Sequence, residues 1–87
     1  MNTFLLKISS PEGDLFCGQA ICLRVRGTEG DLAVLAGHIP FISSVKPCDC
    51  IIDLEDETER VGHVDGGILT VASDAVRLLS GSFVWKD

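Results

Sequence analysis

Apolar and polar residues alternate along most of this chain in short runs, a pattern typical of half-buried β-strands. Near the N-terminus, Phe4, Leu6 and Ile8 share one face of the segment 3–9. The segment 21–26 alternates in the same way, with its apolar residues on one face and a cysteine and two arginines on the other. Glycines and prolines interrupt these runs roughly every 8–12 residues. We therefore predict short antiparallel strands and little or no helix.

Turn-forming residues group the predicted strands into hairpins. The stretch 10–14 (Ser-Pro-Glu-Gly-Asp) combines a proline, which fixes φ, with a glycine that accepts positive φ. The acidic stretch 55–59 suits a hairpin tip because its charges stay in water, and it lacks the spacing and central glycine of a calcium-binding loop. Ser73 and Asp74 form the last turn. The predicted hairpins pair 3–9 with 14–18, 50–54 with 60–64, and 68–72 with 76–79.

The segment 69–79 also fits a helix, because its apolar residues recur at helical spacing and it lacks glycine and proline. We favour strands there, since Thr70 and the valines lower helix propensity and Ser73-Asp74 competes for backbone hydrogen bonds. The predicted fold class is all-β, a two-layer antiparallel β-sandwich or flattened barrel of about ten short strands. A chain of 87 residues is too short for two cores, so residues 1–87 are expected to form a single domain.

Composition excludes several classes of function. Apolar residues make up 46 % of the chain and charged residues 23 %, which favours a packed core over disorder. The net charge is −6 with only 7 basic residues, so we expect no nucleic-acid partner. The sequence has no apolar run of the roughly 18 residues that a membrane-spanning helix needs, and no secretory leader pattern. We expect a soluble, unexported chain that could still sit on a membrane complex.

The chain contains four cysteines, which could form two disulfides or a zinc site: Cys17, Cys22, Cys48 and Cys50. Their spacings, Cys-x₄-Cys and Cys-x-Cys, differ from the paired Cys-x-x-Cys knuckles of zinc ribbons. In an extended strand Cys48 and Cys50 would point to the same face. We expect reduced, inert thiols and predict no metal and no cofactor. A small cysteine-rich metal-binding β-domain stays open as an alternative function.

Four motifs, in order along the chain, resemble those of the β-domain of the epsilon subunit of the rotary ATP synthase. They are Phe-Leu-Leu-Lys-Ile before Pro-Glu (4–12), Gly-x-x-Gly-x-x-Ala (27–33), Ala-Gly-His-Ile-Pro-Phe (36–41) and Val-Asp-Gly-Gly-Ile-Leu-Thr-Val (64–71). Each motif alone would be weak evidence for this family, but the four occur in the family's order and spacing over residues 2–80, and together they are specific for it. Ala33 and Ala36 stand where the family usually has glycine and proline, which affects only the local loop geometry.

The resemblance implies a non-catalytic rotor subunit of the central stalk. Such a subunit joins gamma to the membrane c-ring, so that proton- or sodium-driven rotation is coupled to ATP synthesis or hydrolysis. It would be peripheral, without membrane insertion, on the cytoplasmic face of the bacterial inner (plasma) membrane. Family members usually carry a C-terminal pair of helices, and the expectation from these 87 residues is that this helical domain is absent.

The resemblance also implies which residues touch each partner. The expected c-ring contacts are Glu29, Gly30, Asp31 and His38, and the expected gamma contacts are Phe41, Ile42 and Val45. Taken without the resemblance, the stretch 27–31 is a tight turn, because its two carboxylates and lack of lysine exclude a phosphate loop. A lone histidine in a loop is usually structural, and no nucleophile motif occurs, so no enzymatic activity is expected. A free-standing protein-interaction β-domain is the remaining alternative.

Overall fold

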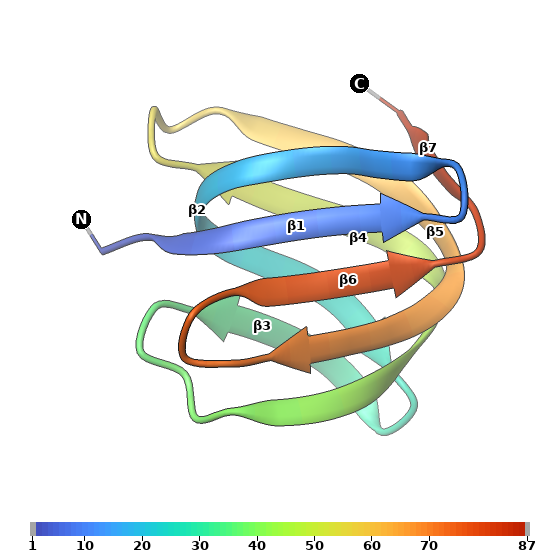
Figure 1. Ribbon diagram of the computed structural model, residues 1–87, viewed down its shortest axis with the longest axis horizontal. Coiled ribbons are helices and arrows are strands. Elements are labelled where there is room, and N and C mark those ends of the chain that lie inside the picture. Colours follow the sequence, from blue (N-terminus) through green and yellow to red (C-terminus); the bar gives the residue numbers. More distant parts are fainter. Residues whose placement is uncertain (1, 87) are drawn as a thin grey trace.

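The computed structural model describes residues 2–86, and this part of the chain forms β-strands and no helix (Figure 1). The strands are β1 (Phe4–Ser10), β2 (Gly13–Gly27), β3 (Gly30–Leu35), β4 (Phe41–Leu54), β5 (Glu59–Val71), β6 (Val76–Ser80) and β7 (Phe83–Trp85). The predicted all-β fold class is confirmed. In the described part of the chain there is no candidate for a membrane-spanning helix.

The strands form a flattened barrel with two additions. β1, β6, β5, β4 and β2 are neighbours in that order, and β1 also pairs with β2, which closes the ring. β3 extends the sheet beside β2, and β7 pairs with β5. The pair β1–β6 is parallel, whereas the other pairs are antiparallel as predicted. A ring of five strands cannot alternate direction all the way round, so one parallel pair is a consequence of closure.

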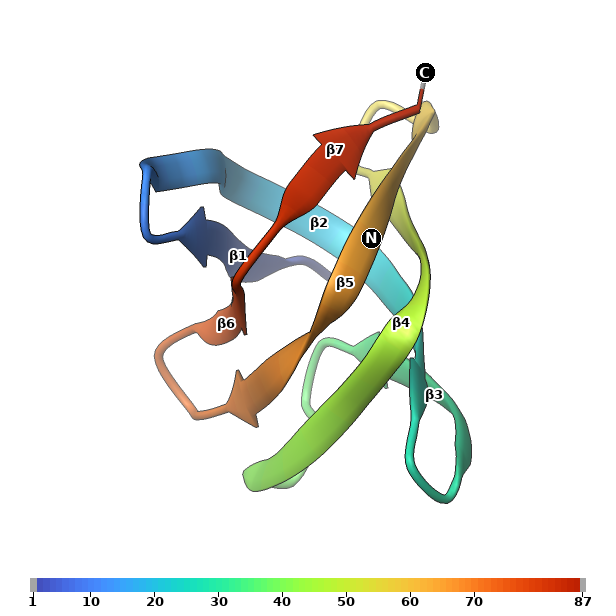
Figure 2. The same ribbon diagram turned by 90° about the vertical axis from the view of Figure 1, so that its right-hand side faces the viewer.

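Three strands are longer than the sequence pattern suggested. β2 has 15 residues, β4 has 14 and β5 has 13. β2 and β5 each join two segments that we expected to be separate, and β4 begins well before the expected segment 50–54. Figure 2 shows β4 and β5 running diagonally from one layer of the sandwich toward the other. The register of β2 with β4 shifts between Ala20 and Cys22, and Gly66 in β5 has a φ of 82°. These irregularities bend the strands without ending them, so seven strands replace the expected ten or so.

The three predicted hairpins are confirmed. β1 pairs with the first half of β2, the end of β4 pairs with the start of β5, and the end of β5 pairs with β6. The last of these turns is closed by a hydrogen bond from the Ala72 N–H to the Ala75 carbonyl (3.0 Å). The segment 69–79 is therefore a hairpin and not a helix.

Alternation along the strands supplies the core. The largest fully buried side chains are Leu6, Ile8, Leu23, Ile52, Leu69, Leu78, Val34, Val64 and Cys50. The C-terminal strand closes one end of this core, because the Phe83 ring packs against Gly62 and meets Trp85 edge-on at 4.8 Å between ring centroids. The Arg60 guanidinium lies 3.7 Å from the centroid of Trp85, which covers the ring from outside. The aromatic end of the chain is thus part of the fold.

Candidate functional site

The acidic tip of the β2–β3 hairpin is a tight turn. Gly27 and Gly30 face each other across two intervening residues, and Gly30 has a φ of 130°, a conformation that favours glycine. The carboxylates of Glu29 and Asp31 are exposed beside this turn. Arg26 donates from Nε to Asp31 Oδ1 at 3.1 Å, so one of the two carboxylates already has a partner within the hairpin. The tip offers an exposed, net acidic contact.

His38 organises the loop between β3 and β4. Nδ1 of His38 lies 3.0 Å from both the N and the O atom of Leu35, and its tautomer decides whether it accepts from the N–H or donates to the carbonyl oxygen. The imidazole lies 5.9 Å from the Phe41 ring, centroid to centroid. Gly37 precedes it with a φ of 85°, which allows the chain to turn there. His38 is exposed, yet its ring is engaged by its own loop. This arrangement fits a positioned loop residue rather than a general base.

The structure does not bring the four expected c-ring contacts together. Residues 29–31 lie at the start of β3, and His38 follows its end. The six residues of β3 span about 20 Å at the rise of an extended strand. A partner that touches both places must therefore run along the full length of β3.

The three expected gamma contacts differ in exposure. Val45 is 5 % exposed and belongs to the core, and Phe41 is half-buried against the core. Ile42 is 74 % exposed and points outward. Only Ile42 thus presents its whole side chain to a docking partner. The reason is the period of two in β4, which sets Phe41 and Val45 on one face and Ile42 on the other.

Sequence reasoning missed two exposed apolar residues beside Ile42. Ile68 of β5 is 49 % exposed and Leu79 of β6 is 52 % exposed, and the two lie directly opposite each other. Ile42 pairs with Thr70, two positions along β5 from Ile68, so all three residues share one outer face. We call Ile42, Ile68 and Leu79 the outer apolar stripe. The signal in the sequence was the adjacent pairs Ile-Leu and Leu-Leu, because two successive apolar residues in a strand must send one side chain outward.

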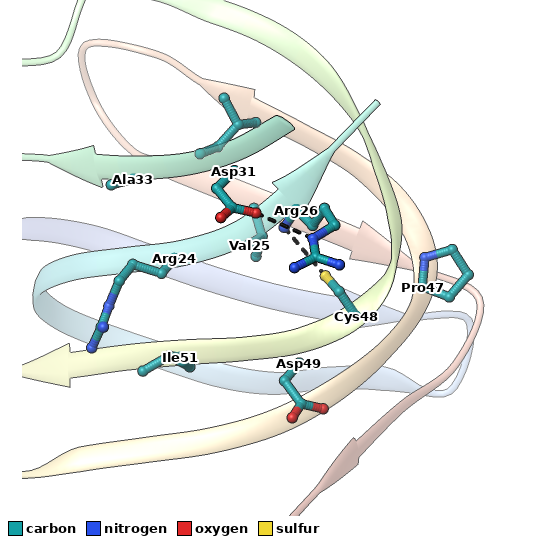
Figure 3. Close-up of a pocket in the computed structure, with 10 residues that line it drawn as sticks. Arg24, Val25, Arg26, Asp31, Ala33, Pro47, Cys48, Asp49 and Ile51 are labelled. Carbon is teal, nitrogen blue, oxygen red and sulfur yellow. Dashed lines mark hydrogen bonds and ion pairs between the residues drawn. The ribbon is translucent and has the colours of Figure 1, made fainter. Parts of the chain in front are cut away.

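A second surface feature is the groove on the outer face of β2, between β3 and β4 (Figure 3). Arg24 contacts the carboxylates of Asp53 at 3.2 Å and Glu59 at 3.4 Å. The backbone N–H of Arg26 donates to Cys48 Sγ at 3.3 Å. The guanidinium of Arg26 pairs with the carboxylate of Asp31 at the hairpin tip. Both arginines are therefore engaged by carboxylates, and the groove has no free positive charge for a phosphate ligand.

The four cysteines are free thiols. Cys48 and Cys50 lie on the same face of β4, as predicted; Cys50 belongs to the core and Cys48 packs against it. Burial, with Cys48 nearby, raises the pKa of the Cys50 thiol to about 12. Burial and the carboxylate of Asp53 also raise the pKa of Cys22. Within residues 2–86, no three His, Cys, Asp or Glu side chains gather closely enough to hold a metal ion.

Two solved assemblies contain chains of the same fold. A chain of the Euglena gracilis mitochondrial ATP synthase, from the OSCP/F1/c-ring in rotational state 1, matches with a TM-score of 0.90 and 19 % identity. That match covers 95 % of this chain and 53 % of the other. A chain of the Tetrahymena thermophila mitochondrial ATP synthase central stalk/c-ring matches with a TM-score of 0.76 and 9 % identity, covering 91 % and 63 %. The chain thus spans between half and two thirds of the length of each matched chain.

Family membership rests on the sequence itself. Residues 3–86 match the sequence profile of the family described as "ATP synthase, Delta/Epsilon chain, beta-sandwich domain". The match includes all four motifs and every strand of the barrel. The resemblance noted in the motifs is confirmed, and the chain belongs to the β-sandwich domain family of the ATP synthase delta/epsilon chain.

Proposed function

We propose that this chain is a non-catalytic central-stalk subunit of an ATP synthase, which joins gamma to the c-ring. The observation that carries the proposal is the family match over residues 3–86, because the delta/epsilon chain is a structural subunit of the stalk. Both similar structures come from assemblies that include the c-ring, which supports the same role. In this role the domain transmits rotation of the ring to gamma, and catalysis takes place on other subunits.

Gamma would dock on the outer apolar stripe. Ile42, Ile68 and Leu79 are between half and three-quarters exposed on one face of β4, β5 and β6. Burying an isoleucine or leucine side chain contributes about 1.5–3 kcal/mol, so covering these partly exposed residues would contribute roughly 3–5 kcal/mol. That is a substantial part of the roughly 8 kcal/mol of a micromolar complex. Phe41 would contact gamma only at its exposed rim, and Val45 would support the surface from the core.

The c-ring would meet the acidic hairpin tip. Glu29, Gly30 and Asp31 lie at an exposed turn, where carboxylates can face polar or basic loops of the ring. Such rim charges contribute to register and to the rate of association more than to affinity. His38, at the other end of β3, would contact the ring only if the ring surface follows that strand.

The chain would then be peripheral to a membrane, held there through the complex. Its assignment to the cytoplasmic face of a bacterial plasma membrane remains a prediction, since both similar structures are mitochondrial.

Substitutions in the stripe test the proposed gamma interface. Ile42→Ala should weaken binding to immobilised gamma by about 1–2 kcal/mol, which is roughly 5–30-fold in Kd, because most of the side chain is exposed before docking. Val84→Ala is the matched control, since Val84 is also an exposed apolar strand residue but lies on β7, outside the stripe. Equal affinities for the Ile42→Ala variant and the unaltered chain would contradict the assignment.

A further inference from the structure

β3 is paired along one edge only. Within residues 2–86 all its register partners belong to β2, and β3 ends the strand order of the sheet. In Figure 1 the β3–β4 loop leads away from the end of β3. Its second edge therefore carries backbone N–H and C=O groups that no strand covers.

The register identifies these groups. Antiparallel strands exchange hydrogen bonds through alternate residues, and the pair that flanks a two-residue turn is a bonded pair. Gly27 and Gly30 are that pair, so the even-numbered residues of β3 bond to β2. The N–H and C=O groups of the odd-numbered residues, Asp31, Ala33 and Leu35, point to the second edge.

His38 closes one end of this edge. His38 Nδ1 lies 3.0 Å from both the N and the O atom of Leu35, so it accepts from the N–H in one tautomer and donates to the carbonyl oxygen in the other. Either bond agrees with the alternation and covers a backbone group of the last residue of the strand. The backbone groups of Asp31 and Ala33 are left as the open part. These two residues offer two N–H donors and two C=O acceptors to an added strand, which are the groups that strand addition uses.

An apolar groove lies beside the open edge. It is lined by Leu32, Ala33, His38, Ile39 and Phe41. Leu32 and Phe41 are half-buried residues that pack against the core, whereas Ile39 is 82 % exposed. A strand added to β3 would send alternate side chains toward this groove, where apolar residues would cover Leu32 and Phe41.

The charges beside the edge favour basic side chains on the other positions of an added strand. Glu29 and Asp31 lie at its N-terminal end. The strand that pairs with the other edge of β3 already has this alternation: the β2 segment Leu-Arg-Val-Arg (23–26) turns its apolar residues inward, and its Arg26 donates a hydrogen bond to Asp31. The unpaired side offers the same backbone, an apolar surface and the same acidic end.

We propose that the open edge of β3 binds an extended segment of another protein, which alternates apolar and basic residues and adds to the sheet as a further strand. This interaction goes beyond the proposed joining of gamma to the c-ring, because it depends only on the edge and its groove. A second copy of this chain is a poorer occupant. Each copy carries a net charge of −6, and β3 itself (Gly-Asp-Leu-Ala-Val-Leu) supplies no basic residue.

The test uses the capped peptide acetyl-Val-Arg-Leu-Arg-Val-amide and the ¹⁵N-labelled chain. In the free chain the amides of Asp31 and Ala33 should exchange quickly with solvent, because no strand covers them. Saturating peptide should slow exchange of the Asp31 and Ala33 amides about tenfold or more and move their proton resonances downfield. The same peptide with N-methyl groups on the amides that face β3 keeps the side chains but cannot pair, so it should have no such effect.

A pair of variants provides the matching control on the protein side. Ala33→Pro removes one open N–H without breaking a bond to β2, and should abolish the effect of the peptide, whereas Ala33→Val should retain it. The peptide comparison uses the unaltered chain, so it stands even if the proline variant unfolds. Equal responses to the methylated and unmethylated peptides would overturn the proposal. Protection of the same amides that grows with protein concentration, without peptide, would overturn the choice of occupant in favour of a second copy.

Discussion

The contact between Gly62 and Phe83 fixes β7 on the barrel, and replacing Gly62 with alanine should destabilise the whole domain. A Cβ at position 62 would lie 2.3 Å from Cζ of Phe83 and 2.8 Å from its Cε1. The ring thus lies directly over the glycine. Phe83 is 9 % exposed and belongs to the core cluster, so the ring cannot move aside without leaving the core.

The size of the effect follows from this displacement. Removing a buried phenylalanine ring typically costs 3–5 kcal/mol, and a ring displaced but not lost should cost about 2–4 kcal/mol in the free energy of unfolding. In a domain of 60–100 residues each kcal/mol lowers Tm by about 4–8 °C, so Gly62→Ala should lower Tm by roughly 10–30 °C. Thermal unfolding followed by circular dichroism measures this directly.

Two further variants make the test specific. Gly18→Ala is the matched control in β2, because its Cβ would meet the Phe16 ring at 3.5 Å, an ordinary van der Waals distance, and it should change stability by no more than about 1 kcal/mol. The double variant Gly62→Ala/Phe83→Leu should lose less stability than the sum of its single changes, since the smaller side chain relieves the overlap. A Gly62→Ala variant with unchanged Tm, or strictly additive losses, would refute the reasoning.

Two other predictions concern charge. Replacing Glu29 with Gln and Asp31 with Asn together should weaken c-ring binding more at low salt than at high salt, because screening reduces the contribution of exposed charges; equal affinity at both salt concentrations would contradict the ring contact. Hydrogen bonds from Lys86 and His63 hold the pKa of Asp49 below its ordinary value. The stabilisation from this ionised carboxylate is present above about pH 3.9 and is lost as the pH falls through the lowered pKa. The difference in Tm between the unaltered chain and Asp49→Asn should therefore disappear in acid, and a difference that persists there would exclude this cause.

The hairpins could be predicted from sequence because their causes are local. A proline and glycine at 10–14 and an acidic stretch at 55–59 form turns whatever surrounds them. The long strands could not be predicted, because glycines and prolines within them imitate turn signals. Pro47 pairs with Asp65 inside the sheet. At Gly67, any side chain would place its Cβ 2.1 Å from the Leu79 carbonyl oxygen. Gly67 serves a close approach between strands, which only the folded structure reveals.

Some of the site residues could likewise be selected from the sequence, whereas others are visible only in the folded structure. The motif resemblance selected the acidic hairpin tip and Ile42 as partner contacts, and the structure shows both as exposed, which leaves their contacts a prediction. It also selected Val45, which a period of two places on the face opposite to Ile42. Ile68 and Leu79 were missed because each stands next to a buried leucine in the sequence, and only the register decides which member of such a pair faces outward. Similarly, the separation of His38 from the hairpin tip follows from the length of β3, which sets residues 29–31 at one end of the strand and His38 beyond the other.

The central claim is that this domain binds gamma, and one titration tests it most directly. The purified chain is titrated into isolated gamma in a calorimeter, with a chelator present so that zinc bound to cysteines contributes no heat. The account predicts saturable one-to-one binding with a negative heat-capacity change, because the outer apolar stripe becomes buried. Absence of binding by a preparation whose circular dichroism shows a folded β-protein would contradict the proposed joining of gamma to the c-ring.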